Sequence, residues 1–413
     1  MNRDRKNYLA HSLEGGLFIG GMSFIAGQTV LTVMAKELGA PNWVISILPI
    51  AMFMGLIMAP IFTASFIERS RHMKRISMIT GVPQRLVFLV AGLVIIFWGE
   101  ERPSLALTAL VLAPILSGAF GGIGHGAWMQ LVARTVPANR RSSLSATRNL
   151  IAATISIFAG IAVERILSAY DGVFGFGLLH LIAFAFLVLS YLFFTQIQEN
   201  VVEPIAIKRS RSLPEYFNEL VTILRADRDF RFFAIMRVTG PFNQFVVPYM
   251  TIYAIDVLGA SASFAGSALI ASTVGQFVGN AIGGVLGDRL GGKMLLVIAR
   301  VAFLLSFICA TMAQTYFAFM LFFFTTMLAA SINGIGNMTL MLEIAPDHRR
   351  PTYGALAGLL NGPSMILLSL VGSMYWTSFN SMQLQALIAS CGMIISTYAI
   401  CKVREPRRNK LTL

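Results

Sequence analysis

One acidic side chain, Glu14, stands inside the first long apolar run of the sequence, which extends over residues 9–35. A carboxylate in such a run can take up and release a proton away from bulk water. Around it, polar residues recur at three- and four-residue spacing and therefore share one helix face; they are His11, Glu14, Gly21, Gln28 and Thr32. This pattern predicts a proton-relay carboxylate on a polar stripe. The alternative is that Glu14, near the start of the run, is wetted at the surface.

Two further groups could act together with Glu14. Arg85 lies deep in the third apolar segment. Because arginine keeps its proton in proteins, Arg85 could neutralise Glu14 or an anionic substrate, or it could serve structurally by bonding backbone carbonyls. His125 could titrate near neutral pH, or it could be a packed histidine. Glu14, His125 and Arg85 are the predicted proton-coupling groups, whereas Arg237 and Arg300 are expected to snorkel towards the nearer surface.

Other chemistries lack their residue patterns. The sequence contains neither H-E-x-x-H nor G-x-S-x-G, and its carboxylates have no metal-ligand spacing. Residues 287–293 match G-x-x-x-x-G-K, but Met294 follows where a phosphate-binding loop needs Ser or Thr. The three cysteines lie in apolar stretches without a C-x-x-C pair. We therefore expect no enzyme, no cofactor and no metal, and no ATP-driven motor.

The composition is that of an integral membrane protein. Of 413 residues, 56% are hydrophobic and only 12% are charged, about half the charge of soluble proteins. Segments of about 20 apolar residues can cross a bilayer as helices. Twelve such segments are present, at residues 9–36, 42–67, 75–98, 104–132, 142–167, 173–196, 230–257, 261–287, 293–313, 316–342, 351–376 and 381–402. The expected fold class is an all-α membrane protein with twelve transmembrane helices.

The basic residues indicate the orientation. Of the 32 Lys and Arg, 26 fall in the two tails and the loops on one side, and three fall in the opposite loops. Cytoplasmic loops carry such an excess, so both termini are expected in the cytoplasm and the chain in the cell (inner) membrane. The net charge of +13 then needs no nucleic-acid partner.

Short phrases recur in the same order in the two halves. "TVPANRRSS" at 135–143 returns as "IAPDHRRPT" at 344–352, "ELGAP" at 37–41 as "VLGAS" at 257–261, and "IERS" at 67–70 as "GDRL" at 287–290. We interpret the chain as a duplicated module. The expected domains are a six-helix bundle at 1–197, a cytoplasmic linker with an amphipathic helix at 198–229, and a second six-helix bundle at 230–413.

The stretch "GGVLGDRLGGKMLL" at 283–296 resembles the loop motif of the major facilitator superfamily. The first-half copy at 64–74 keeps Glu68 and Arg69, and the fifth span lacks the Gly-Pro pair of the proton-antiporter signature. The resemblance implies two pseudo-symmetric bundles that rock about a central cavity lined by spans one, four, seven and ten. It also implies that the motif loops close the cytoplasmic mouth.

Two sets of site residues are predicted on this basis. The substrate cavity is expected to include Gln28, Thr32, His125, Trp128, Asn243, Gln244, Tyr249, Asn333 and Asn337. The cytoplasmic gate is expected to include Glu68, Arg69, Gly284, Asp288, Arg289, Lys293, Arg140, Arg141, Arg349 and Arg350. The alternative for these arginines is that they only set the topology.

The expected function is secondary active transport of a small organic molecule, with protons as the coupling ion, by a monomer in the lipid bilayer. Amides and aromatics with few charges favour an amphipathic or neutral substrate, and efflux is preferred. One alternative is proton symport for uptake of a small polar solute. Another is a transport-dead membrane sensor or scaffold with the same fold.

Overall fold

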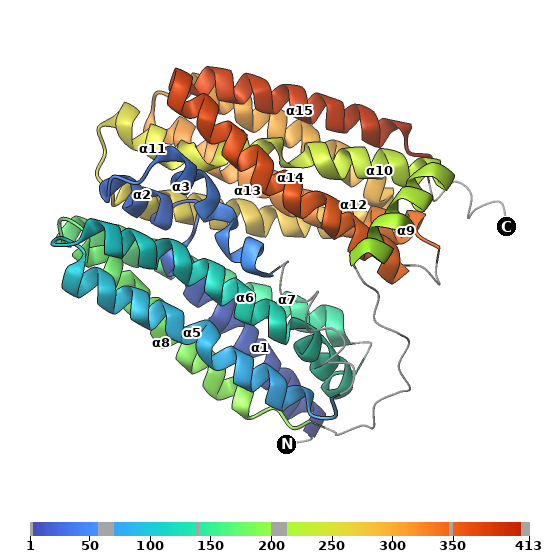
Figure 1. Ribbon diagram of the computed structural model, residues 1–413, viewed down its shortest axis with the longest axis horizontal. Helices are drawn as coiled ribbons and strands as arrows, with labels where there is room; N and C mark the ends of the chain where they lie inside the picture. The colour runs from blue at the N-terminus through green and yellow to red at the C-terminus, as the bar shows by residue number, and fades with distance from the viewer. Residues whose placement is uncertain (1–2, 57–69, 138–139, 200–212, 347–349, 406–413) are drawn as a thin grey trace. The chain divides into compact units, whose positions relative to one another are not determined.

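The computed structural model describes residues 3–56, 70–137, 140–199, 213–346 and 350–405. Within these ranges all the assigned elements are helices, and none is a strand (Figure 1). Ten of the described helices are long and apolar enough to cross a membrane. Two of the predicted spans differ from these ten: the second is described only as far as residue 56, and the seventh is broken into shorter pieces. The twelve-helix, all-α membrane fold expected from the sequence is therefore confirmed.

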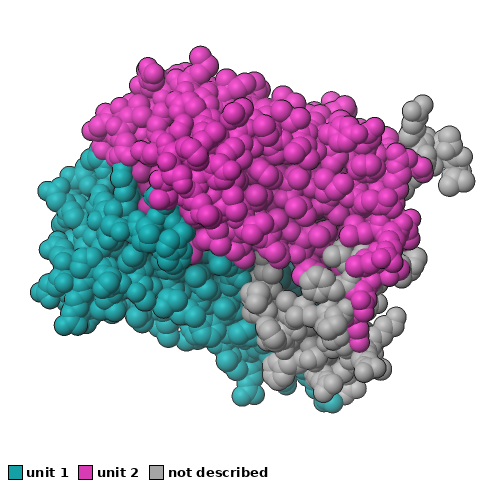
Figure 2. Space-filling view, turned by 45° about the horizontal axis from the view of Figure 1, so that its top comes forward, with its two compact units in different colours: residues 1–44, 48–210, 261–269 teal, residues 45–47, 211–260, 270–413 magenta. Residues whose placement is uncertain are grey.

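Contacts divide the chain into two compact units (Figure 2). Residues 1–44, 48–210 and 261–269 form the first, and residues 45–47, 211–260 and 270–413 form the second. The domain limits expected from the sequence remain predictions.

The helices of the first unit pack in two groups around α8. Helix α1 packs against α7 and α8, and α5 packs against α6 and α8. The helical elements run in chain order as α1 (Arg3–Met22), η1 (Ser23–Ile25), α2 (Val30–Glu37), α3 (Asn42–Ile47), η2 (Leu48–Ile50), α5 (Met73–Trp98), α6 (Pro103–Thr135), α7 (Arg141–Ala169) and α8 (Phe174–Thr195).

The second unit repeats this packing with its own first, fifth and sixth spans. Helix α10 packs against α14 and α15, and so does the 3₁₀ segment η4 that follows it. The elements are α9 (Leu213–Ala226), α10 (Arg228–Thr239), η4 (Gly240–Phe245), α11 (Val247–Leu258), α12 (Phe264–Met312), α13 (Tyr316–Ile344), α14 (Arg350–Phe379) and α15 (Met382–Lys402). Helix α9 falls in the segment for which a linker helix is predicted.

The first span of each unit is a broken helix. In the first unit the helix stops at η1, and Gly27 in the gap lies so close to η2 that a Cβ would stand 2.7 Å from the Leu48 carbonyl oxygen. In the second unit Pro241 follows Gly240 in η4 and Pro248 opens α11, and proline cannot donate a helical hydrogen bond. Broken helices inside a membrane expose backbone polar groups where they line a cavity.

Helix α12 contains the spans Phe264–Gly287 and Arg289–Met312. Gly291, at φ 81° and ψ 171°, separates the two helical runs. This backbone region is almost closed to residues with a Cβ, so the motif loop needs glycine there. Gly292 in turn lies against α13, where a Cβ would stand 2.3 Å from the Leu340 nitrogen.

Equivalent contacts in the two units show the duplication directly. Lys74 donates from Nζ to the Thr195 carbonyl (2.7 Å), and Lys293 donates to the Cys401 carbonyl (3.3 Å), which lies 206 positions after Thr195. The Asn7 side chain accepts from the Gln198 N–H (2.8 Å). Its counterpart 222 positions later, Asp229, accepts from the Arg404 N–H (3.0 Å). The first and the third span of each unit are thus joined to the end of the sixth in the same way twice.

Candidate functional site

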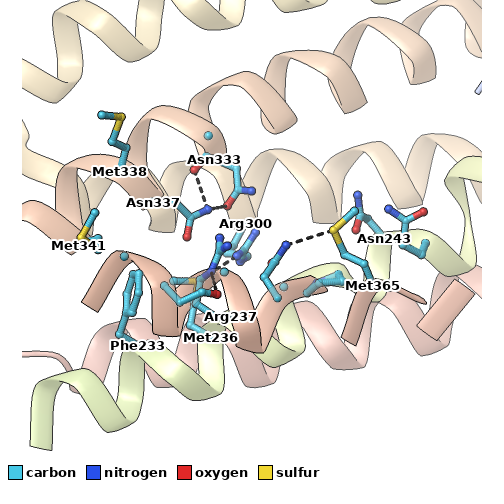
Figure 3. A pocket seen from close by; sticks show the side chains of 18 residues that line it. Phe233, Met236, Arg237, Asn243, Arg300, Asn333, Asn337, Met338, Met341 and Met365 are labelled. Atoms are coloured by element: carbon cyan, nitrogen blue, oxygen red, sulfur yellow. Dashed lines mark hydrogen bonds between the residues drawn. The ribbon is translucent and has the colours of Figure 1, made fainter. Parts of the chain in front are cut away.

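A cavity of about 520 Å³ in the second unit lies between α10, η4, α12, α13 and α14 (Figure 3). Five amide side chains line it. Four of them are sequence-predicted cavity residues and come from two places: Asn243 and Gln244 from the break at η4, and Asn333 and Asn337 from one face of α13. The structure therefore brings these four together, and Asn361 of α14 is the fifth.

Two of the amides have hydrogen-bonding capacity that the described residues do not use. Asn337 donates from Nδ2 to the carbonyl and side-chain oxygens of Asn333 (2.8 and 3.0 Å). Its own Oδ1 and the Gln244 Oε1 are buried without a hydrogen-bond partner. Because an amide can present oxygen or nitrogen by turning over, these groups can accept from a bound molecule or donate to it.

Two arginines that we expected to snorkel also line this cavity. Arg300 is 1% exposed, so the prediction was wrong for it. It donates from Nε to the Ser396 hydroxyl (2.9 Å) and from Nη2 towards the Met236 sulfur (3.3 Å), and its Nη1 is buried without a partner. Arg237, half-buried, donates to the Ala357 carbonyl (3.3 Å). Figure 3 shows the two side chains close together beside Met236.

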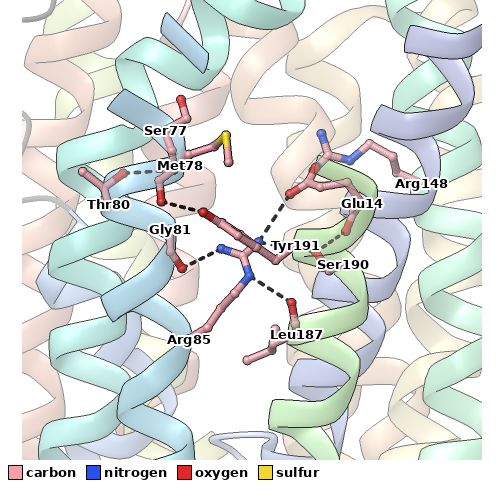
Figure 4. Close-up of polar contacts among 10 residues, drawn as sticks. All are labelled: Glu14, Ser77, Met78, Thr80, Gly81, Arg85, Arg148, Leu187, Ser190 and Tyr191. Atoms are coloured by element: carbon pink, nitrogen blue, oxygen red, sulfur yellow. Dashed lines mark hydrogen bonds and ion pairs between the residues drawn. The ribbon is translucent and has the colours of Figure 1, made fainter. Parts of the chain in front are cut away.

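The first unit holds a different charge cluster, built around Glu14 (Figure 4). Glu14 is buried, 6% exposed, so the alternative of a wetted carboxylate does not hold in this structure. Its Oε1 lies 3.9 Å from Arg85 Nη2, and its Oε2 lies 3.7 Å from Arg148 Nη2. One carboxylate thus faces two guanidiniums, and the cluster carries one positive charge in excess.

Arg85 is firmly held. It donates to the Leu187 carbonyl (3.0 Å), the Gly81 carbonyl (2.9 Å) and the Ser190 hydroxyl (3.4 Å). Ser190 itself donates to the Glu14 carbonyl (2.8 Å). The guanidinium also lies over the ring of Tyr191, 5.1 Å from its centroid. Arg85 therefore joins α1, α5 and α8 as well as neutralising Glu14.

Arg148 has fewer partners among the described contacts. Besides Glu14 it lies over the Trp128 ring, 4.6 Å from the centroid. Trp128 in turn stacks on His125 at 5.9 Å. The arginine crosses α1 at Gly15, where a Cβ would stand 1.7 Å from its Nε. Two sequence-predicted residues, His125 and Trp128, are therefore linked to Glu14 through Arg148, which was not among the predicted site residues.

Arg148 lies near the start of the fifth apolar segment, so the presence of a charge inside that predicted span was readable in the sequence. Arg237 and Arg300 also stand inside predicted spans, but their charged groups were expected to reach the membrane surface. Depth alone does not tell where a long side chain turns. Their neighbours in other helices decide it, and those were not readable.

Three residues that were predicted to line the substrate cavity lie outside the cavity of the second unit. Tyr249 is fully buried and stacks on Trp376 at 4.6 Å. Thr32 is fully buried and donates to the Thr29 carbonyl (3.2 Å). Gln28 is half-buried in the break between η1 and α2. They pack the broken segments, and none lines the cavity of the second unit.

The predicted gate is only partly described. Glu68, Arg69 and Arg349 lie outside the described residues, and the side chains of Arg141, Asp288 and Arg350 are not described either. Arg140 and Arg289 are exposed, and Gly284 faces open space. Lys293 bonds the carbonyls of Cys401 and Val403 (3.3 and 2.7 Å), which ties the motif loop to the end of α15.

In the first unit, Glu199 joins the end of the sixth span to the start of α5, and the sequence analysis did not predict it. Glu199 accepts from the N–H groups of Met73 and Lys74 (3.0 and 2.9 Å) at the start of α5. It also pairs with Arg134 at 3.0 Å. A carboxylate at a helix N-terminus is a stabilising cap, and here it fixes the end of the first bundle to the loop before α5.

Comparisons with known proteins agree with this architecture. A family model described as "Major Facilitator Superfamily" matches residues 232–412, whereas no curated protein matches the sequence. A mutant form of the nucleoside transporter NupG is similar over 98% of this chain and 100% of its own, with 14% identity and a TM-score of 0.74. The D-xylose-proton symporter is similar over 98% and 99%, with 14% identity and a TM-score of 0.73.

A bacterial homologue of the iron transporter ferroportin is similar over 97% of this chain and 98% of its own, with 12% identity and a TM-score of 0.65. Identities this low show a shared fold alone. Residues 232–412 of this multi-pass membrane protein thus match the family model, and the whole length has the fold of these transporters.

Proposed function

We propose that the chain is a secondary active transporter that moves a small organic solute by alternating access, and that Glu14 carries the coupled proton. The observation that supports this proposal is the buried carboxylate between two guanidiniums, with ion-pair distances of 3.9 and 3.7 Å. A buried charged group that can lose one partner is what proton coupling requires, because proton binding must then alter the packing of the helices.

The proton and the two arginines compete for the same carboxylate. Breaking a buried ion pair by removing one charge costs about 3–5 kcal/mol, which is a factor of a hundred or more in a binding constant. Arg85 is fixed by its bonds to α5 and α8, so it stays. Arg148 is the partner with fewer contacts, and we assign it the movement that frees Glu14 for the proton.

The amides and arginines that line the cavity of the second unit favour uptake of a polar solute. The sequence alone had favoured efflux of an amphipathic molecule. Five amides and two arginines face one cavity, and such groups bind polar ligands by hydrogen bonds that orient them. Proton symport for uptake of a small polar solute fits this lining best. Efflux of the same solute would use the same binding groups. The direction of transport is therefore measured separately.

Transport by the purified chain in liposomes tests the proposal. Under an imposed pH gradient, a panel of labelled polar solutes is offered on either side of the membrane. We expect pH-driven accumulation by the unmodified chain. Glu14→Gln should lose that accumulation but keep solute exchange at equal pH. Glu101→Gln, which alters an exposed carboxylate between α5 and α6, is the matched control and should behave like the unmodified chain.

Two results would count against the proposal. Accumulation by Glu14→Gln equal to that of the unmodified chain removes Glu14 from the coupling step. Failure of the unmodified chain to move any solute in the panel, in a protein shown to be folded, favours the sensor or scaffold alternative. Glu14→Asp keeps the charge and should retain part of the accumulation, which separates a lost proton site from a misfolded bundle.

A further inference from the structure

The cavity of the second unit contains two positive charges and no described negative one. Arg237 and Arg300 both line it, and none of the lining residues is Asp or Glu. The guanidiniums are near enough to repel each other, and no described carboxylate pairs with either. Arg300 is 1% exposed and its Nη1 has no partner. Burying an ion without a counter-charge costs several kcal/mol of free energy. An anion from outside the chain would lower this cost.

The duplication identifies which counter-charge is missing. In the first unit Arg85 reaches the Ser190 hydroxyl and the Glu14 carboxylate. In the second unit Arg300 reaches the Ser396 hydroxyl, and Ser396 lies 206 positions after Ser190, the same separation as Thr195 from Cys401. The two serines are therefore equivalent.

The position equivalent to Glu14 is then Met236. The two lie 222 positions apart, the same separation as Asn7 from Asp229 in the same spans. Arg300 directs its Nη2 at the Met236 sulfur (3.3 Å), as Arg85 directs its Nη2 at Glu14.

The arginine is displaced by one helical turn, since Arg300 follows Lys293 by seven residues and Arg85 follows Lys74 by eleven. Its long side chain still reaches the equivalent serine. The second unit therefore keeps the arginine and the serine of the cluster but has a thioether where the first has a carboxylate.

A thioether is only a weak acceptor and carries no charge. It cannot neutralise Arg300, whose planar fork of five donors fits the two oxygens of a carboxylate or phosphate. Arg300 lines the cavity together with Arg237, and the amides of Asn243, Asn333 and Asn337 line the same space. The cavity of about 520 Å³ falls within the range of small-ligand sites.

We propose that this cavity binds the anionic group of the transported solute, which is a small organic oxyanion held by Arg237 and Arg300, with the amides bonding its uncharged polar part. The proposal rests on the transport function proposed above and names its substrate class. Two guanidiniums match two negative charges, so a dicarboxylate or a phosphate monoester should bind more tightly than a monocarboxylate of the same size.

Binding to the purified full chain tests this without any transport. The probes are a dicarboxylic acid and a phosphate monoester of similar size, each with its uncharged amide or alcohol counterpart. Inorganic phosphate alone is a further probe. Affinity is measured by calorimetry and by the shift in unfolding temperature. We expect one of the two acid classes to bind at least about 100-fold more tightly than its uncharged counterpart, as desolvated charge pairs do.

Met236→Glu supplies the missing carboxylate inside the chain. It should raise the unfolding temperature without ligand and weaken anion binding by at least about 100-fold, because the internal group occupies the fork. Met312→Glu, which adds a carboxylate at an exposed residue outside the cavity lining, is the matched control and should stay within about threefold of the unmodified affinity. A stability gain together with the lost binding distinguishes an occupied site from a misfolded bundle.

Three outcomes would overturn the inference. They are equal affinity for an acid and its uncharged counterpart, unchanged anion affinity in Met236→Glu, and binding of inorganic phosphate as tight as that of every organic anion. Its failure is separable from failure of the proposed function. Glu14→Gln should retain anion binding while losing pH-driven accumulation. Loss of anion selectivity with proton coupling intact removes only the substrate class, and the reverse result removes only the coupling.

Discussion

At the scale of single residues, the sequence predicted four of the five amides that line the cavity but not the arginines that join them. Asn333 and Asn337 are four apart and share a helix face. The family resemblance implied that their span and the span of Asn243 and Gln244 line one cavity. Arg148 and Arg300 needed more. Each is placed by partners on other helices, Glu14 and Ser396 respectively, and no local pattern shows such partners.

The two arginines beside Glu14 should differ sharply in their effect on stability. Arg85→Gln removes three hydrogen bonds to α5 and α8 together with the pair to Glu14. We expect a loss of about 3–5 kcal/mol in the free energy of unfolding. Arg148→Gln leaves Glu14 paired with Arg85 and removes the excess charge, so its cost should be below about 1.5 kcal/mol.

Denaturant unfolding of both variants in the same detergent measures this difference. Arg85→Lys, which keeps the charge but not the forked geometry, should fall between them. Equal destabilisation by Arg85→Gln and Arg148→Gln would show that the bonds to α5 and α8 contribute little to the first bundle.

At the scale of helices, the sequence predicted position and length better than continuity. Hydropathy averages over about a whole span, so the breaks at η1 and η4 do not lower it enough to be seen. Pro241 and Pro248 stood in the sequence as possible interruptions, but membrane helices tolerate proline. Gly27 is needed because another segment passes close to it, at the Leu48 carbonyl, and that contact is tertiary.

The glycines of the loop motif should respond differently to alanine. Gly291 stands at φ 81° and ψ 171°, a region that costs about 1–3 kcal/mol for a residue with a Cβ. Gly291→Ala should therefore lower the unfolding temperature. Gly284 lies in a helix and a Cβ there would meet nothing within 4 Å, so Gly284→Ala should be neutral or stabilise by up to about 1 kcal/mol.

Thermal unfolding of the two single variants beside the unmodified chain is the measurement. Both positions belong to the same motif, so a shared effect on folding of the loop cancels in the comparison. If Gly291→Ala were as stable as Gly284→Ala, the bend at residue 291 would not depend on glycine.

At the scale of the whole molecule, composition and repetition predicted the most. Ten spans are present as helices, and the recurring phrases correspond to recurring contacts, such as Lys74 to Thr195 and Lys293 to Cys401. What the repeat could not show is where the copies have diverged. The exchange of Glu14 for Met236 becomes visible only when an arginine in each unit is seen to reach equivalent serines.

Orientation in the membrane follows from charge and remains to be measured. With twelve spans, both termini must lie on one side, and the excess of Lys and Arg in the tails and alternate loops predicts that this side is the cytoplasm. Reporter fusions active only in the cytoplasm should therefore report from both termini and from the linker after residue 199. A fusion at the α5–α6 connection near Glu101 should be silent there and active with a reporter of the opposite side. Opposite locations for the two termini would require an odd number of crossings, and two equivalent six-helix units could not then be related by an axis normal to the membrane.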